Sequence, residues 1–177
     1  MVKGWSIRAA LGFLAVILIL VPDGSARAAA QISAQAPCTT GGGGECFNFG
    51  VGIVGLGQFD MRSFAFRAPS KGTAEVTFHG SLVCGADNSR ANVVVDLITQ
   101  IVNSRTAVPQ ANGPGGMRQA VVLRANTSDS FNLASTRTFS FGSAGTQTFY
   151  FRVRPLRIDS GADCYIYNAA FTVMFIP

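Results

Sequence analysis

Apolar and polar residues alternate in the last third of the chain, which predicts β-strands there. Over residues 146–154 the two-residue period places Phe149, Phe151 and Val153 on one face and polar side chains on the other. Residues 170–176 are almost wholly apolar, so large side chains occupy both faces of this segment. A strand of that kind suits a position covered on both sides, because it would be costly at an exposed edge. We therefore expect two antiparallel strands at the C-terminal end.

The same period predicts further strands in the middle of the chain. Alternate residues of 74–84 are apolar, and Cys84 shares their parity, so its side chain should point toward the core. Turn-forming residues at 69–72 and 143–145 separate such segments. We expect the other strands at residues 62–66, 118–125, 131–135 and 138–141.

Two segments leave a choice open. Residues 92–102 fit both a strand and the stripe of an amphipathic helix, and their density of Val and Ile favours the strand. At Pro155 the alternation slips, because Leu156 and Ile158 have the opposite parity to Val153. A bulge or bend at Pro155 would reconcile them.

About eight to ten short strands separated by turns predict an all-β sandwich or barrel, and we favour a single antiparallel β-sandwich. The longest predicted loop covers residues 103–116 and contains Asn112 in a glycine- and proline-rich segment. Long loops on rigid β scaffolds are frequent binding sites. This loop, with Asn112, is therefore a candidate for binding.

The first thirty residues have the features of a secretory signal. Lys3 and Arg8 precede an apolar stretch at 9–22, and small residues at 26–30 fit the cleavage site of a signal peptidase. The apolar stretch is shorter than the ~20 residues of a bilayer span; an uncleaved anchor is the alternative. We expect a secreted or periplasmic protein without a membrane span after cleavage, divided into a signal peptide, a flexible glycine-rich arm and a β-sandwich domain at residues 1–30, 31–46 and 47–177.

Charge and aromatic content narrow the class of partner. The signal carries three of the fourteen basic residues and one of the nine acidic residues, so its removal lowers the net charge from +5 to +3. This mild basicity lacks the clustered positive charge of a nucleic-acid-binding protein, and we expect no nucleic-acid partner. The only tryptophan lies in the signal, which weakens the case for a lectin that stacks sugars on indole rings.

All four cysteines lie after the signal: Cys38, Cys46, Cys84 and Cys164. An even number in an exported chain, with no CxxC pair, favours two disulfides over a metal site. We prefer Cys38 with Cys46 and Cys84 with Cys164, because Cys84 and Cys164 both lie on predicted strands and share parity with apolar neighbours. The main alternative joins Cys46 to Cys84 and Cys38 to Cys164.

Few residues could support catalysis or cofactor binding. His79 is the only histidine, and its position opposite the apolar parity predicts a solvent-facing side chain instead of a member of a catalytic triad. Residues 50–55 match a dinucleotide fingerprint, but no helix is predicted after them. Asp159 and Asp163 flank a turn without the dense acids of a calcium loop. We therefore expect no enzyme, no cofactor and no metal.

Tyr150, Arg152 and Arg154 share the polar face of one predicted strand, which makes them candidate binding residues. Such a stripe could meet an acidic glycan, a lipid headgroup or a carboxylate of a partner. A solvated sheet face is the simpler explanation of the same pattern.

Residues 66–78, 144–149 and 171–176 resemble the strand pattern of C1q/TNF-like jelly rolls, in which the last strand lies in the middle of a sheet. The resemblance implies a jelly-roll-like sandwich that acts as a trimeric recognition module without catalysis. The chain is also similar to chaperone-usher pilin domains in the 38-residue separation of Cys46 and Cys84. However, residues 31–44 lack the alternating apolar side chains that a donated strand needs.

These patterns together predict a non-enzymatic exported binding or structural module. We expect it to engage a protein or glycan partner at the cell surface, through its loops or through a homo-oligomer interface. A pilus-type adhesive subunit is the second hypothesis and a secreted enzyme is the third.

Overall fold

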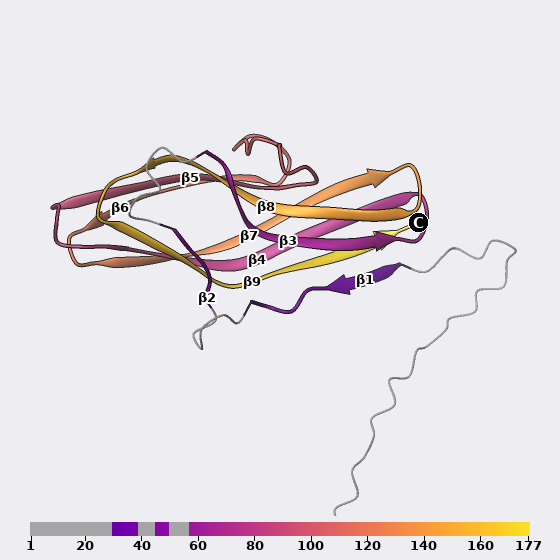
Figure 1. The fold of residues 1–177 in the computed structure, drawn as a ribbon, viewed down its shortest axis with the longest axis horizontal. Coiled ribbons are helices and arrows are strands. Elements are labelled where there is room, and N and C mark those ends of the chain that lie inside the picture. Colours follow the sequence, from indigo (N-terminus) through magenta and orange to yellow (C-terminus); the bar gives the residue numbers. More distant parts are fainter. Residues whose placement is uncertain (1–29, 39–44, 50–56) are drawn as a thin grey trace, which may run out of the picture.

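The computed structural model describes residues 30–38, 45–49 and 57–177, which fold into a sandwich of two antiparallel sheets (Figure 1). Within these residues there is no helix long and apolar enough to cross a membrane. The predicted signal peptide, apart from its last residue, and the glycine motif at 50–55 lie outside the described residues. The strands are β1 (Gln31–Ala34), β2 (Glu45–Phe49), β3 (Phe59–Ala68), β4 (Gly72–Ala86), β5 (Asn92–Val102), β6 (Gly116–Arg124), β7 (Ser128–Phe141), β8 (Gly145–Ile158) and β9 (Ala162–Ile176).

The strand order is that of a jelly roll. One sheet, here called sheet A, has the order β1-β9-β4-β7, and β2 pairs with β9 beside β1; the other, sheet B, has the order β3-β8-β5-β6. From β2 onward each strand lies in the opposite sheet from the one before it, except for β5 and β6, which are neighbours in sheet B. The prediction of an all-β, jelly-roll-like sandwich is confirmed.

Phenylalanine side chains join the two sheets at their centre. Phe78 of β4 stacks on Phe151 of β8 with ring centroids 3.7 Å apart, and Phe171 of β9 meets Phe78 edge-on at 5.2 Å. All three rings are fully buried. Burial of each such side chain contributes roughly 1.5–3 kcal/mol to folding, and aromatic pairing adds to it.

One of the predicted strands is confirmed, and two others are a single strand in the structure. Residues 92–102 form strand β5, so the helical alternative is wrong. The segments 131–135 and 138–141 are not two strands but parts of β7, whose register with β4 is unbroken. Thr136 and Arg137 do not interrupt it: they pair with Thr77 and Val76 of β4.

The predicted bulge at Pro155 is confirmed. Leu97 of β5 pairs with Pro155 and the preceding Asp96 pairs with Arg157, so Leu156 is the extra residue of β8. Leu156 is 42% exposed. After it, the alternation resumes with the opposite parity, and Ile158 is buried in the core.

The last strand is less enclosed than its composition suggests. β9 has hydrogen-bonded neighbours on both edges, but the outer face of its C-terminal end is only partly covered. Met174 is half-buried and Ile176 is 49% exposed on that face. The expectation of cover on both sides is therefore wrong: after Ala170, only the inner row, which includes Phe171, Val173 and Phe175, is fully buried.

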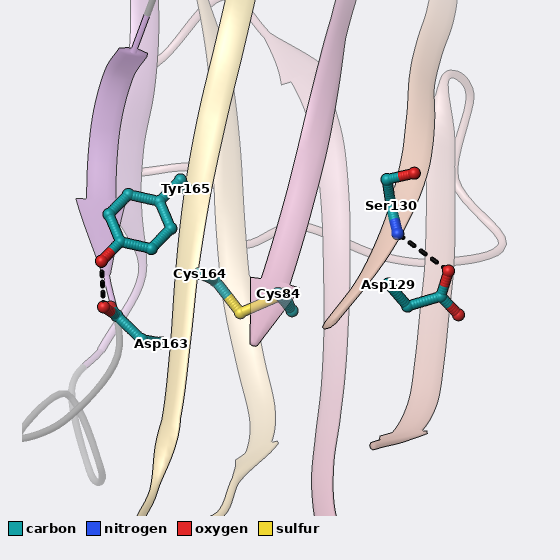
Figure 2. The surroundings of a disulfide bond; sticks show 6 residues. All are labelled: Cys84, Asp129, Ser130, Asp163, Cys164 and Tyr165. Atoms are coloured by element: carbon teal, nitrogen blue, oxygen red, sulfur yellow. Dashed lines mark hydrogen bonds between the residues drawn. A yellow bond between two sulfur atoms is a disulfide. The ribbon is translucent and has the colours of Figure 1, made fainter. Parts of the chain in front are cut away.

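The disulfide between Cys84 and Cys164 is confirmed and the alternative pairing of these cysteines is wrong. The two residues lie directly opposite each other on β4 and β9, with Cα atoms 4.1 Å apart (Figure 2). The bond therefore clamps two neighbouring strands of one sheet. Cys38 is also disulfide-bonded, but the side chain of Cys46 lies outside the described part of the chain, so the pairing of Cys38 with Cys46 stays a prediction.

The start of the predicted arm is attached to the sandwich. β1 pairs with β9. In the chain that follows β1, the side chain of Gln35 is hydrogen-bonded to that of Arg62 on β3. Arg62 Nε donates to Gln35 Oε1 at 2.8 Å, while Gln35 Nε2 donates to the carbonyl of Ser63 at 3.0 Å. Arg62 also donates to the carbonyl of Ala36 at 3.0 Å. This set of bonds, here called the arm clasp, ties the arm to the edge of sheet B, in contrast to the expected flexible arm.

The two carboxylates at the turn between β8 and β9 accept hydrogen bonds from other groups of the protein. Asp159 accepts hydrogen bonds from the guanidinium of Arg157 at 2.7 and 2.9 Å and from the backbone N–H of Val94 at 2.9 Å. Asp163 accepts a hydrogen bond from the hydroxyl of Tyr165. Among the described residues no group of three possible ligands could hold a metal ion. Asp159 thus links the turn to β5, whereas Asp163 bonds within β9.

Replacing both Cys84 and Cys164 by alanine is expected to lower the free energy of unfolding by about 4 kcal/mol, because the bond closes a loop with a sequence separation of 80 residues. Urea unfolding followed by circular dichroism measures the loss. Ser130→Ala, at an exposed position of β7 near the bond (Figure 2), is the control and should stay within about 0.5 kcal/mol of wild type. Equal stability of the double variant and the wild type would contradict the clamp.

Asp159 should make the fold sensitive to acid. Its hydrogen bonds from Arg157, and then from Val94, lower the pKa of the carboxyl below the usual value of ~3.9. The stabilisation is therefore complete above that value and is lost as pH falls through the lower pKa of the folded state. Urea midpoints of Asp159→Asn should lie below wild type at neutral pH, and the gap should close as the pH falls through the lowered pKa of Asp159 in the folded state. A constant gap at all pH values would contradict this; Glu75→Gln, an exposed position of β4, is the control.

Candidate functional site

Arg152 is the centre of a polar network on the outer face of sheet B. Its side chain is 7% exposed, and its Nε lies 2.7 Å from Oδ1 of Asp60 on β3, an ion pair without hydrogen-bond alignment. Its Nη1 donates to the carbonyl of Ala107 at 2.7 Å and to Gln58 at 3.3 Å. Asp60 also accepts a hydrogen bond from Arg105 at 2.7 Å, which raises the pKa of that guanidinium. The charged groups of this network thus pair with other groups of the protein.

The loop at residues 103–115 is fastened over the same face. Gln100 of β5 is 5% exposed; its Nε2 donates to the carbonyl of Pro114, and its Oε1 accepts from the backbone N–H of Gln110, both at 3.0 Å. Together with Arg152, these bonds hold both halves of the loop. The cover also explains why residues 98–102 of β5 are buried on both faces, which is the reason for their ambiguous sequence pattern.

The structure separates the four binding candidates that the sequence singles out. Tyr150, Arg152 and Arg154 share the outer face, but Arg152 is buried beneath the loop, which differs from both a binding stripe and a solvated face. Tyr150 is half-buried, with the guanidinium of Arg105 5.8 Å from its ring centroid. Arg154 and Asn112 are exposed on β8 and on the loop.

A hollow of about 380 Å³ opens on the other outer face, that of sheet A. Three strands, β4, β7 and β9, meet around it. By strand parity the side chains of His79 and Ser81 on β4 and of Asn132 and Ala134 on β7 point outward, away from the core. The lining consists of His79, Gly80, Ser81, Asn132, Leu133, Ala134 and Asn168.

A bulge in β9 lies beside the hollow. The register between β4 and β9 shifts by one residue next to Gly80, and Asn168 in the bulge has a φ of 52°. Asparagine tolerates this left-handed conformation better than most residues. A Cβ on Gly80 would lie 3.3 Å from the Cα of Ala169 and from the carbonyl oxygen of Tyr167. Glycine therefore allows the bulged strand to approach β4 closely.

The polar side chains of the hollow are free to meet a ligand. Within the described part of the chain, His79, Ser81, Asn132 and Asn168 make no side-chain hydrogen bond. An asparagine amide both donates and accepts hydrogen bonds, and a serine hydroxyl and a neutral imidazole do the same. The site therefore offers uncharged donors and acceptors on three strands.

The hollow brings His79 and Ser81 together, the combination that a hydrolase would need. They are neighbours on one face of β4, about 7 Å apart along the strand, and no hydrogen bond joins them. A catalytic triad also requires a carboxylate that orients the histidine, and no Asp or Glu is among the lining residues. The arrangement suits hydrogen bonding to a ligand better than nucleophilic attack.

Sequence reasoning placed His79 in solvent, as the structure has it, but missed Asn132 and Asn168. One signal for the bulge was present: Ile166 and Phe171 are both apolar and have opposite parity, as at Pro155. The partnership of Asn132 with β9 had no local signal, because β7 and β9 lie on opposite sides of β4 in the sheet.

Comparisons with known proteins add no functional assignment. No protein-family model matches the sequence, and no curated protein matches it significantly. Among solved structures, the VP2 subviral particle of infectious bursal disease virus matches 85% of this chain and 34% of its own, with 8% identity and a TM-score of 0.38. The T13 particle of the same virus matches 95% and 35%, with 12% identity and a TM-score of 0.38.

A family two carbohydrate esterase from Cellvibrio japonicus matches 84% of this chain and 36% of its own, with 13% identity and a TM-score of 0.22. This chain spans about a third of each matched protein. At these identities and TM-scores the matches support no inference about function. They do not test the C1q/TNF-like and pilin-like resemblances, which stay predictions.

Arg152→Ala is expected to lower the free energy of unfolding by about 3 kcal/mol, because it leaves Asp60 with one of its two cationic partners and releases the carbonyl of Ala107. The loosened loop should become a trypsin site after Arg105, detected by mass spectrometry of the fragments. Arg154→Ala, two residues along the same face but exposed, is the control. Identical urea midpoints and digestion of both variants would contradict the role of Arg152.

Proposed function

We propose that the protein is an exported, non-enzymatic binding module that holds its partner at the hollow of sheet A. One observation carries the proposal: the polar groups on the two outer faces differ in whether they have hydrogen-bond or ion-pair partners within the protein. The core of the sheet B network, Arg152, Asp60 and Gln100, pairs within the protein. Around the hollow, by contrast, polar side chains have no such partners in the described residues. A concave site with a few convergent polar groups is the usual form of a binding site.

Export is supported by the sulfur chemistry. The disulfide between Cys84 and Cys164 persists in an oxidising compartment, such as the periplasm or the exterior of the cell, and would be reduced in most cytosols. The predicted signal at residues 1–30 agrees with this location.

The arm clasp favours a module that works without strand exchange. A pilus-type subunit would have to release its N-terminal arm and insert it into a neighbour. Here release would break the bonds between Gln35 and Arg62, expose groups that are partly buried, and unpair β1 from β9. The trimer implied by the C1q/TNF-like resemblance stays a separate prediction, which light scattering would test.

A panel of immobilised macromolecules tests the proposal: a neutral polysaccharide, an acidic polysaccharide, gelatin and duplex DNA. We expect the protein to be retained on one of the first three and not on DNA. The double variant His79→Ala, Asn132→Ala should lose at least about tenfold in affinity, since it removes two of the free polar groups.

Arg154→Ala, on the opposite face, is the matched control and should bind like wild type. Retention that the double variant leaves unchanged, or no retention on any material, would contradict binding at the hollow.

A further inference from the structure

The chemistry around the hollow indicates which ligands suit it. Asn132 and Asn168 present amides, and Ser81 and His79 add further groups that can exchange hydrogen bonds. No Lys, Arg, Asp or Glu lies among the lining residues. A charged ligand would lose water here without gaining an opposite charge. The lining therefore favours an uncharged ligand rich in hydroxyl groups.

Two tyrosines continue the site along β9. Tyr165 and Tyr167 alternate with buried residues, so both rings lie on the outer face, with centroids 6.2 Å apart and planes tilted by 35°. Tyr167 is opposite Ser81 in register and precedes Asn168, so it borders the hollow. The hydroxyl of Tyr165 donates to Asp163, which holds its ring in place (Figure 2). We call this pair the tyrosine platform.

On the other side of the hollow the outer face stays uncharged across three strands. Thr136, Thr77 and Thr172 form one row over β7, β4 and β9. The hydroxyls of Thr77 and Thr136 lie 3.1 Å apart and share a hydrogen bond. An extended ligand that crosses the hollow would thus meet aromatic rings on one side and hydroxyl groups on the other.

We propose that the hollow and the tyrosine platform bind a neutral saccharide, an inference that rests on the proposed function. The C–H face of a sugar ring packs on an aromatic ring, while its hydroxyls exchange hydrogen bonds with amide and hydroxyl side chains. The volume of about 380 Å³ lies in the lower part of the ~300–1,000 Å³ range of small-molecule sites. It accommodates a short stretch of a saccharide chain, and the flanking rows extend the contact.

Calorimetric titration with defined probes tests the inference. The probes are neutral oligosaccharides of glucose, mannose, galactose, xylose or N-acetylglucosamine, with galacturonate oligomers and a collagen-derived peptide for comparison. At least one neutral oligosaccharide should bind and should shift the side-chain amide signals of Asn132 and Asn168 in NMR spectra. Tyr167→Ala and Asn132→Ala should each weaken this binding at least tenfold.

Thr138→Ala, on the same outer face of β7 but remote from the hollow in register, should bind like wild type. Circular dichroism and urea midpoints verify that each variant is folded. If only galacturonate or the peptide binds, and Asn132→Ala weakens it, the saccharide inference is overturned while the proposed function stands. If no probe binds, or if neither Tyr167→Ala nor Asn132→Ala weakens binding, the saccharide inference and the proposed function are both overturned.

Discussion

The pairing of β4 with β9 is the contact on which the rest of the structure depends. It lies in the middle of sheet A, and it supplies Phe78 and Phe171 to the aromatic cluster that Phe151 completes from sheet B. The disulfide clamps one end of this pairing. Near its middle the bulge at Asn168 interrupts it. The same two strands therefore hold the core together on one face and form the candidate site on the other.

Polar side chains close the sandwich where the sheets alone would leave it open. On one side the arm clasp links Arg62 of sheet B to the chain beside β9 of sheet A. On the other, the loop at 103–115 is held by Gln100 and by Ser135 of β7, whose hydroxyl donates to the carbonyl of Gly115 at 2.6 Å. These bonds give a partner to backbone carbonyls that lie outside the strand ladders. Arg152 thus supports the fold, whereas its sequence position resembled that of a binding residue.

The outer faces of the two sheets carry different kinds of side chain. Sheet B carries charged residues that pair with one another, as in the contact of Asp96 with Arg118 at 2.7 Å. Sheet A carries hydroxyls, amides and tyrosines around the hollow and the neighbouring register shift. A bulge re-aims side chains and interrupts pairing, which is why bulges frequently occur beside functional sites. In this protein the bulge comes from β9, while the groups that face it come from β4 and β7.

Local sequence patterns determined the fold class, strand β5, the bulge at Pro155 and the disulfide between Cys84 and Cys164. The strands and the bulge follow from the alternation of side chains along a single strand, and the same alternation placed both cysteines of the disulfide on the core side, although it left a second pairing open. Only the tertiary structure decided that Arg152 is buried and that Asn132 and Asn168 share a hollow. Those outcomes depend on which distant strand or loop covers a given face, and a two-residue period assigns faces without saying what lies over them. The covering loop owes its position in part to hydrogen bonds from residues of other strands, Ser135 on β7 and Arg152 on β8, which the sequence of the loop itself does not reveal.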